Sequence, residues 1–283
     1  MTTEYWKWPE SRWSSQDIDW RKAGTITAGL DIGSVSSQAV VLCDDNLFCN
    51  ASNYTSPDIA GNARATLDRA LEGTGMSPDD IQSIVATGFG QDTVPFAAAT
   101  ANEITCHAKG ARFMFGPGVM TVVDLGGQTA KAIKMYQWDR IRDFAMNDKC
   151  AVNMGYGIEI LADLLQVPIT EIGERSLGDM EDPEPVSTTC HTFALTETMG
   201  LLREGMTEQQ VLASHIFAVE WRLYAMIGRI SPENELAFTG GLAKNAGIVK
   251  RLERDMKMKA VTSDYDPMLA GAIGAAILGR EKL

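Results

Sequence analysis

Apolar runs and short glycine-rich turns follow each other along this chain in a series that occurs twice. The first series holds three β-prone runs, a segment with helical spacing and one further short strand, at residues 25–31, 38–43, 47–54, 57–72 and 81–86. The second series begins with three more β-prone runs and ends, after a long helical section, in another strand, at residues 119–124, 129–135, 139–146 and 235–238. Successive strands followed by alternating helices and strands predict an α/β fold with a mixed sheet in each half.

The two series align residue by residue at their starts. The aligned segments are Asp31-Ile32-Gly33-Ser34 with Asp124-Leu125-Gly126-Gly127, and Gln38-Ala39-Val40 with Lys131-Ala132-Ile133. An internal repeat of this length indicates duplicated domains. We therefore expect an N-terminal arm at 1–24, domain I at 25–118, domain II at 119–265, and a C-terminal helix at 266–283 that packs back on domain I.

The N-terminal arm is rich in tryptophan. Trp6, Trp8, Trp13 and Trp20 are four of the six tryptophans in the chain, and they show neither a helical nor a strand period. Tryptophan is enriched at protein interfaces. Two interpretations stay open: the arm packs on a partner subunit, or it folds back on the core of its own chain.

Composition and charge narrow the functional classes. A chain of 283 residues with 45% hydrophobic and 22% charged residues can form a substantial core. The formal net charge of −12 argues against a nucleic-acid partner, because binding to a phosphate backbone needs a basic face. No apolar run reaches the roughly 18–20 residues of a membrane span, and the start of the chain lacks the pattern of a signal peptide. We therefore expect a cytoplasmic location and no membrane association.

Each repeat places an aspartate at the end of an apolar strand, directly before a glycine-rich turn. Backbone N–H groups in such turns can approach phosphate oxygens closely, and a neighbouring carboxylate can hold Mg²⁺ or its water ligands. A single turn of this kind is typical of an ordinary hairpin. Two such turns in register, after Asp31 and Asp124, together with a third turn at 239–241, predict a site that grips one polyphosphate from both sides.

These motifs resemble those of the acetate and sugar kinase/Hsp70/actin superfamily. The turns after Asp31 and Asp124 are similar to its two phosphate motifs, and residues 238–241 are similar to its adenosine motif. The resemblance covers residues 25–283 and implies two duplicated ribonuclease H-like domains, with ATP and Mg²⁺ in the interdomain cleft. It implies catalytic roles for Asp31 and Asp124. The candidate nucleotide-binding residues are Gly33, Ser34, Ser36, Ser37, Gly126, Gly127, Gln128, Gly155, Gly240, Gly241 and Lys244.

The five cysteines are too scattered for a complete metal site within one chain, and cysteines in a cytosolic protein rarely form disulfides. Cys150 and Cys190 differ from Cys43, Cys49 and Cys106 because each stands just before a helical pattern. A helix N-terminus stabilises a thiolate through the helix dipole and the unpaired N–H groups. Spacing alone leaves a purely structural role for both cysteines as the other interpretation.

The segments around these cysteines resemble those of a narrower family. Residues 86–90, 103–111, 146–150 and 187–194 are similar to segments of the BadF/BadG/BcrA/BcrD ATPase family, which includes the activators of 2-hydroxyacyl-CoA dehydratases. Within that family the chain is most similar to the D-type ATP-binding subunit of ATP-dependent benzoyl-CoA reductase. Glu103 is a candidate base or water-positioning residue, with an ordinary surface glutamate as the alternative.

The resemblance implies a shared redox function. Cys150 and Cys190 would supply two of the four ligands of a [4Fe–4S] cluster, and a second ATP-binding subunit would supply the other two. ATP hydrolysis would drive an electron from ferredoxin, at low potential, to benzoyl-CoA-reducing subunits that carry the ring-reduction site. The alternatives are a homodimeric activator ATPase of a 2-hydroxyacyl-CoA dehydratase and a cluster-free small-molecule kinase of the same superfamily.

The chain also departs from the family pattern near the expected nucleotide. The family usually has lysine at the position of Gln38, aspartate at Thr129 and glutamate at Leu195, whereas Glu197 is retained. These departures leave open whether this subunit hydrolyses ATP itself, and they favour a subunit of a heteromeric complex. Finally, residues 171–185 are acidic and contain proline and glycine, so we expect them to form a surface loop.

Overall fold

The computed structural model describes residues 4–136, 140–147, 154–178, 183–188, 190–233 and 235–283. The chain divides into two units, each built from segments that are distant in sequence. The first unit comprises Glu10–Val119, Met135–Ile141 and Thr262–Leu283. The second unit comprises Met1–Pro9, Met120–Lys134 and Arg142–Val261.

The first unit is built around a six-stranded mixed sheet with the order β1-β4-β3-β2-β5-β6. The strands β2, β3 and β4 form an antiparallel meander, and β5 lies parallel to β2. In strand order along the chain, the bounds are Ser11–Ser14, Ile26–Ile32, Ser36–Cys43, Asn46–Tyr54, Ser83–Thr87 and Ala99–Thr100. The helices are α1 (Ile59–Leu71), α2 (Glu103–Phe115) and α8 (Ala270–Arg280), with short 3-10 helices at Trp20–Lys22, Pro78–Asp80, Gln91–Thr93 and Pro267–Leu269.

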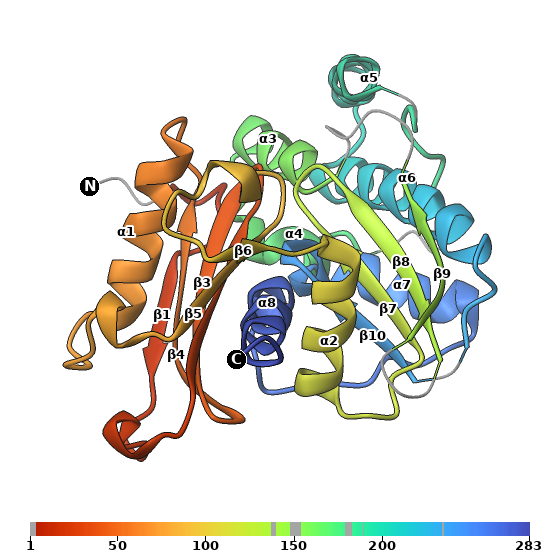
Figure 1. The fold of residues 1–283 in the computed structure, drawn as a ribbon. Coiled ribbons are helices and arrows are strands. Elements are labelled where there is room, and N and C mark those ends of the chain that lie inside the picture. The colour runs from red at the N-terminus through yellow and green to blue at the C-terminus, as the bar shows by residue number, and fades with distance from the viewer. Residues whose placement is uncertain (1–3, 137–139, 148–153, 179–182, 189, 234) are drawn as a thin grey trace. The chain divides into compact units, whose positions relative to one another are not determined.

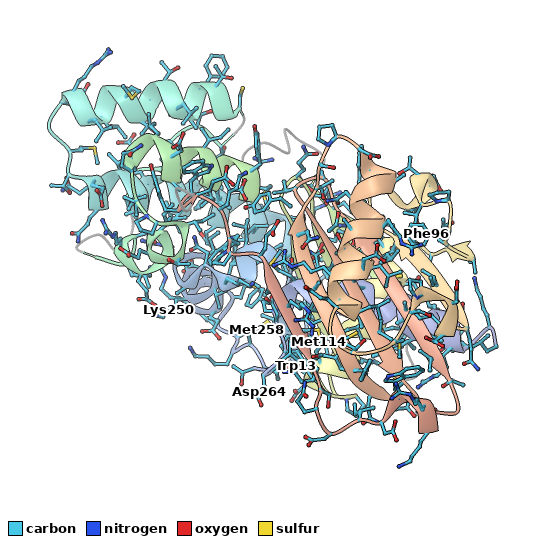
Figure 2. The ribbon with its side chains drawn as sticks, turned by 90° about the vertical axis from the view of Figure 1, so that its left-hand side faces the viewer. Trp13, Phe96, Met114, Lys250, Met258 and Asp264 are labelled. Carbon is cyan, nitrogen blue, oxygen red and sulfur yellow. The ribbon has the colours of Figure 1, made fainter. Side chains whose placement is uncertain are left out.

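Helices cover both faces of this sheet, which explains why its central strands read as continuous apolar runs. Helix α1 lies on one face, while α8 and α2 lie on the other (Figure 1). Alternate residues of β3 accordingly belong to different clusters: Val41 packs with the α1 side, and Val40 with the α8 side. Phe96 and Met114, both labelled in Figure 2, belong to the α1-side and the α8-side clusters respectively.

The tryptophan-rich arm folds back on its own chain at three of its four tryptophans. Trp6 and Trp8 pack against the core of the second unit, whereas Trp20 packs against the core of the first. Trp13 lies on β1, the edge strand that pairs with β4, and 49% of its surface is exposed. The arm therefore contains a strand that its largely polar sequence did not predict.

The second unit has a four-stranded mixed sheet with the order β10-β7-β8-β9, in which β10 lies parallel to β7. The strand bounds are Thr121–Leu125 for β7, Ala130–Met135 for β8, Ile141–Met146 for β9 and Leu236–Thr239 for β10. The helices are α3 (Gly155–Leu165), α4 (Ile169–Arg175), α5 (His191–Arg203), α6 (Glu208–Gly228) and α7 (Ala246–Met256), and a 3-10 helix, η5, spans Gly241–Lys244.

One expectation for the second unit is wrong in part. The segment 171–185 does not begin as a loop, because its first five residues complete helix α4. Ile169 and Ile172 of this helix are buried in the core of the unit. Burial of these two apolar side chains stabilises a helix here, although the residues that follow are acidic. Among the described residues, no helix combines the length and the apolar character that a bilayer crossing requires.

Glu220 of α6 is a buried carboxyl group in the core of the second unit. Its pKa is raised from the ordinary value of 4.5 to about 7, chiefly by burial and then by the neighbouring Asp255, while Arg254 and Arg251 oppose the shift. A carboxyl group whose pKa is raised on folding contributes most to stability below its unfolded pKa, and that contribution is lost as the pH rises through the folded pKa. Stability should therefore fall between about pH 4.5 and pH 7.

We expect Glu220→Gln to stabilise the protein at pH 8, because the amide removes the buried negative charge. A shift of this size corresponds to a gain on the order of 2–3 kcal/mol at pH 8 and a smaller change at about pH 4.5. Urea denaturation at a series of pH values measures both effects. Glu204→Gln, at an exposed position, is the matched control and should leave the pH profile as in the wild type. Parallel profiles for wild type and Glu220→Gln would contradict the prediction.

Candidate functional site

The predicted repeat is present in the pairing of the strands. Asp31 lies opposite Gln38 across β2 and β3, and Asp124 lies opposite Lys131 across β7 and β8. The hairpin turns close in the same way, because Gly33 N–H donates to the Ser36 carbonyl at 3.0 Å and Gly126 N–H donates to the Thr129 carbonyl at 2.9 Å. The two halves of the chain therefore present the same backbone turn directly after an equivalent aspartate.

A second pair of equivalent turns completes each half. Thr87 at the end of β5 pairs with Asp31, and Thr239 at the end of β10 pairs with Asp124. Each threonine is followed by a glycine with positive φ: Gly88 at 86° and Gly240 at 84°. A methyl group added at Gly88 would lie 2.4 Å from Asp31 Oδ1, and one at Gly240 would lie 2.8 Å from Asp124 Oδ1. Glycine is therefore required at both positions, since backbone passes directly over each carboxylate.

In the second unit, a buried ion pair neutralises the aspartate. Lys131 Nζ lies 3.1 Å from Asp124 Oδ2 and 3.1 Å from Thr129 Oγ1, and Lys131 is only 2% exposed. The hydroxyl group of Thr239 donates to Asp124 Oδ1 at 3.3 Å. Asp124 is thus held in one orientation by groups from neighbouring strands on both sides.

In the first unit, the equivalent aspartate has different neighbours. His107 of α2 places Nε2 3.8 Å from Asp31 Oδ2, and both residues are buried. A methyl group added at Gly271, in the first turn of α8, would lie 2.0 Å from the same oxygen. At the position opposite Asp31, Gln38 donates to the hydroxyl groups of Ser36 at 2.9 Å and Ser52 at 3.1 Å. The two halves have the same backbone conformation around the aspartate, but they differ in the side chains that surround its carboxylate.

The hydroxyl groups of the first turn are placed differently from one another. Ser37 is fully buried, where its hydroxyl group donates to Asn62 at 2.7 Å and shares a hydrogen bond with Thr55 at 2.8 Å. Ser34 and Ser36 are half-buried at the turn itself. Of the three serines predicted to bind nucleotide, Ser34 and Ser36 therefore have the hydroxyl groups nearer to solvent.

The start of α3 braces the second turn. Gly155 N–H donates to the Gly126 carbonyl at 3.4 Å, and Tyr156 N–H donates to the Gly127 carbonyl at 2.9 Å. A methyl group at Gly155 would lie 3.0 Å from the Cα atom of Gly127. On the other side of the turn, Asn147 Nδ2 donates to the Gln128 carbonyl at 3.2 Å. Four predicted residues, Gly126, Gly127, Gln128 and Gly155, therefore lie together.

The adenosine-like motif lies at the end of β10. Gly240 packs over Leu125 and Asp124, and the next residues form the 3-10 helix η5, which contains Gly241 and ends at Lys244. Asn245 then caps α7 by accepting a hydrogen bond from Ile248 N–H at 3.1 Å. The predicted residues of the second unit thus form one continuous set, whereas the cleft expected between the two units stays a prediction.

Glu103 occupies the first position of α2, directly after the capping residue Asn102. Asn102 Oδ1 accepts a hydrogen bond from Ile104 N–H at 2.9 Å. A carboxylate in the first turn stabilises a helix through its dipole. This structural role accounts for Glu103 by itself, and the base or water-positioning role stays a prediction.

Cys190 has the environment of a stabilised thiolate. It is the half-buried N-cap residue of α5, and backbone N–H groups of Phe193 and Thr192 lower its pKa. Burial instead raises the pKa of Cys43 to about 11, and those of Cys49 and Cys106 to about 12. Cys190 is therefore the described cysteine best suited to bind a metal.

The segment before Cys190 is tied to α5. Glu197, the glutamate retained from the family pattern, accepts a hydrogen bond from Ser187 N–H at 2.6 Å. Cys150 lies outside the described residues, and α3 begins five residues after it, at Gly155. Among the residues that are described, no group of three or more histidine, cysteine, aspartate and glutamate side chains is arranged to hold a metal ion.

The chain is similar in sequence to other proteins over most of its length. Residues 28–279 match the family described as the BadF/BadG/BcrA/BcrD ATPase family. The activator of lactoyl-CoA dehydratase from Anaerotignum propionicum is 34% identical over 255 residues, which are 90% of this chain and 97% of that protein. The D-type subunit of benzoyl-CoA reductase from Thauera aromatica is 28% identical over 265 residues, which are 90% of this chain and 93% of that protein.

A solved structure supports the same relationship. The activator of the 2-hydroxyisocaproyl-CoA dehydratase from Clostridium difficile, with bound ADPNP, is similar to this chain with a TM-score of 0.83 and 30% identity. The similarity covers 91% of this chain and 95% of that one. Together with the two mixed sheets, it confirms the predicted α/β fold of the acetate and sugar kinase/Hsp70/actin type.

Proposed function

This chain belongs to the BadF/BadG/BcrA/BcrD ATPase family. We propose that it is an ATP-binding subunit that delivers electrons to an enzyme of acyl-CoA metabolism. In this proposal, ATP hydrolysis is coupled to the transfer of an electron at low potential. The observation that carries it is the position of Cys190 at the N-terminal end of α5, where the backbone N–H groups of Phe193 and Thr192 lower the pKa of its thiol.

Cys190 and Cys150 would hold one side of a [4Fe–4S] cluster, and a second ATP-binding subunit would hold the other side. Such a cluster needs four thiolates, so one chain with two candidate ligands is incomplete. When bound, the cluster would carry one electron at a time. The N–H groups of Thr192 and Phe193 would donate to the sulfur of Cys190 and thereby tune the potential.

The two glycine-rich turns would bind the phosphates of ATP, with Mg²⁺ beside Asp31. Lys131 already neutralises Asp124 inside the second unit. We therefore assign binding of Mg²⁺ or its water ligands to Asp31, and positioning of the second glycine-rich turn to Asp124. In the first turn, Gln38 donates to two serine hydroxyl groups at the position where the family usually has lysine. Binding of Mg·ATP would therefore rely on backbone N–H groups more than on side-chain cations.

Two classes of electron acceptor are compatible with this function. The identity of 34% to a lactoyl-CoA dehydratase activator favours a 2-hydroxyacyl-CoA dehydratase as the acceptor. The departures at Gln38, Thr129 and Leu195 favour a subunit of a heteromeric benzoyl-CoA reductase, with ferredoxin as the donor and separate ring-reducing subunits. Purification with the natural partners, followed by assays of dehydration and of benzoyl-CoA reduction, separates the two classes.

Cys190→Ser is the test of the cluster. The protein purified without oxygen should contain about four irons per pair of ATP-binding subunits, and the variant should lose the iron, the acid-labile sulfide and the visible colour. Electron transfer should be lost as well, while the fold is kept because Cys190 lies at the N-terminal end of α5 and is not fully buried. Cys43→Ala, at a buried thiol of raised pKa, is the control and should retain the iron. A colourless wild-type protein that transfers phosphate to a small molecule would contradict the proposal.

A further inference from the structure

The N-terminal arm places an indole ring against the adenosine-like turn of the second unit. A methyl group at Gly241 would lie 3.9 Å from Cδ1 of Trp8, and Nζ of Lys244 lies 5.7 Å from the centre of the Trp8 ring. The ring is half-buried, and it packs against the same core as Ala243 of η5. Trp8 therefore lies against both ends of η5, the segment that follows the turn.

The arm holds this ring in place through several contacts within the second unit. The carbonyl group of Tyr5 accepts a hydrogen bond from Ile169 N–H at 2.9 Å, which fixes the arm at the start of α4. The rings of Tyr5 and Trp6 pack edge to face, with centroids 5.1 Å apart. Lys7 pairs with Glu4 at 2.9 Å. The indole of Trp8 is thus positioned by the residues before it.

The surroundings of Trp8 suit a flat aromatic ligand. Gly240 and Gly241 carry no side chains, so a ligand can approach the backbone closely there. Lys244 adds positive charge next to the ring, and an indole offers a broad face for stacking on a nucleotide base. These features suit the base of a nucleotide, whereas the glycine-rich turns at Asp31 and Asp124 are the proposed phosphate-binding segments.

We propose that Trp8 is part of the nucleotide site and contacts the base of the bound nucleotide. This inference rests on the proposed function, in which ATP binds at Gly240, Gly241 and Lys244. Trp8 precedes the region of the chain that matches the family, which begins at residue 28, so the arm adds a binding residue from outside that region. The consequence is that the arm contributes to binding of the nucleotide base.

The test compares a ligand with a base and a ligand without one. Dissociation constants for Mg·ATP and for Mg·tripolyphosphate are measured by calorimetry on the full chain and on the variants Trp8→Leu and Trp8→Phe. Trp8→Leu keeps apolar bulk on the core but removes the aromatic face, so it should weaken ATP binding roughly ten-fold or more and leave tripolyphosphate binding unchanged. Trp8→Phe should recover most of the affinity for ATP. Trp13→Ala, on β1 of the other unit, is the control.

The affinities of the Trp8 variants for the two ligands distinguish base contact from a purely structural role. A selective loss of ATP affinity in Trp8→Leu, with rescue by phenylalanine, supports the inference. Equal affinities for ATP in Trp8→Leu and wild type overturn it, as does an equal loss for both ligands, because that loss would mean a purely structural role. If the wild type binds tripolyphosphate but not ATP, or neither, the proposed function fails first and the inference fails with it.

Discussion

Replacing Lys131 with methionine is expected to lower the free energy of unfolding by about 3–5 kcal/mol. Lys131 Nζ lies 3.1 Å from Asp124 in an interior where the lysine is 2% exposed. The substitution keeps most of the apolar stem but removes the ammonium group, so the carboxylate of Asp124 stays buried while its neutralising charge is gone. Urea denaturation of the purified variant measures the loss.

Two further variants isolate the cause of this effect. Lys131→Met combined with Asp124→Asn removes both charges and should recover a large part of the lost stability, because neither charge of the pair is then left in the interior. Lys250→Met breaks the pair with Glu174, in which both side chains are more than half exposed, and should cost less than about 1 kcal/mol. Equal losses for Lys131→Met and Lys250→Met would show that the buried pair is not stabilising the second unit.

The second large effect is expected for Gly240→Ala, which should both destabilise the second unit and abolish nucleotide binding. Gly240 has a φ of 84° and a ψ of 172°, a backbone conformation that costs a residue with a side chain about 1–3 kcal/mol. The added methyl group would also lie 2.5 Å from the carbonyl oxygen of Leu125. Relief of that overlap requires β10 to move away from β7, at a further cost of about 1–3 kcal/mol.

Gly116 provides a matched control for this substitution. Its φ of 98° and ψ of 165° are close to those of Gly240, but an added methyl group would meet nothing within 4 Å among the described residues. Gly116→Ala should therefore show the backbone cost alone, and the difference between the two variants measures the steric part. Thermal denaturation gives the stabilities, and calorimetry with Mg·ATP gives the binding. A Gly240→Ala variant as stable as Gly116→Ala, with unchanged ATP affinity, would contradict the prediction.

Much of the fold could be predicted from the sequence because the central strands are buried on both faces. Runs such as 38–43 and 119–124 consist mainly of apolar residues, and they correspond to β3 and β7 within two residues of the predicted bounds. The internal repeat also aligned Lys131 with Gln38, each seven residues after an equivalent aspartate. Only the structure shows that this spacing puts an ammonium group beside the carboxylate of Asp124.

Contacts between segments far apart in sequence could not be predicted in this way. His107 lies near Asp31 because α2 packs on the same side of the sheet as α8, and periodicity gives no distance between a helix and a strand. The position of Trp8 depends on how the arm crosses the second unit, and a polar segment with scattered tryptophans carries no such information. Strand β1 was not predicted for a related reason, since its residues are half-buried or exposed and do not alternate.

That short strand also has a consequence for association between molecules. β1 pairs with residues 49–52 of β4, so it occupies the outer edge of a strand that is nine residues long. An open edge of this length offers unpaired N–H and carbonyl groups to the strand of another molecule, which is a common route to aggregation. Arg12 of β1 also donates a hydrogen bond to the Arg69 carbonyl near the end of α1 at 2.9 Å, and this bond fixes β1 against the first unit. The arm therefore blocks pairing between the β4 edges of two molecules. A chain trimmed to the family-matched region, which begins at residue 28, would expose this edge and should aggregate more readily.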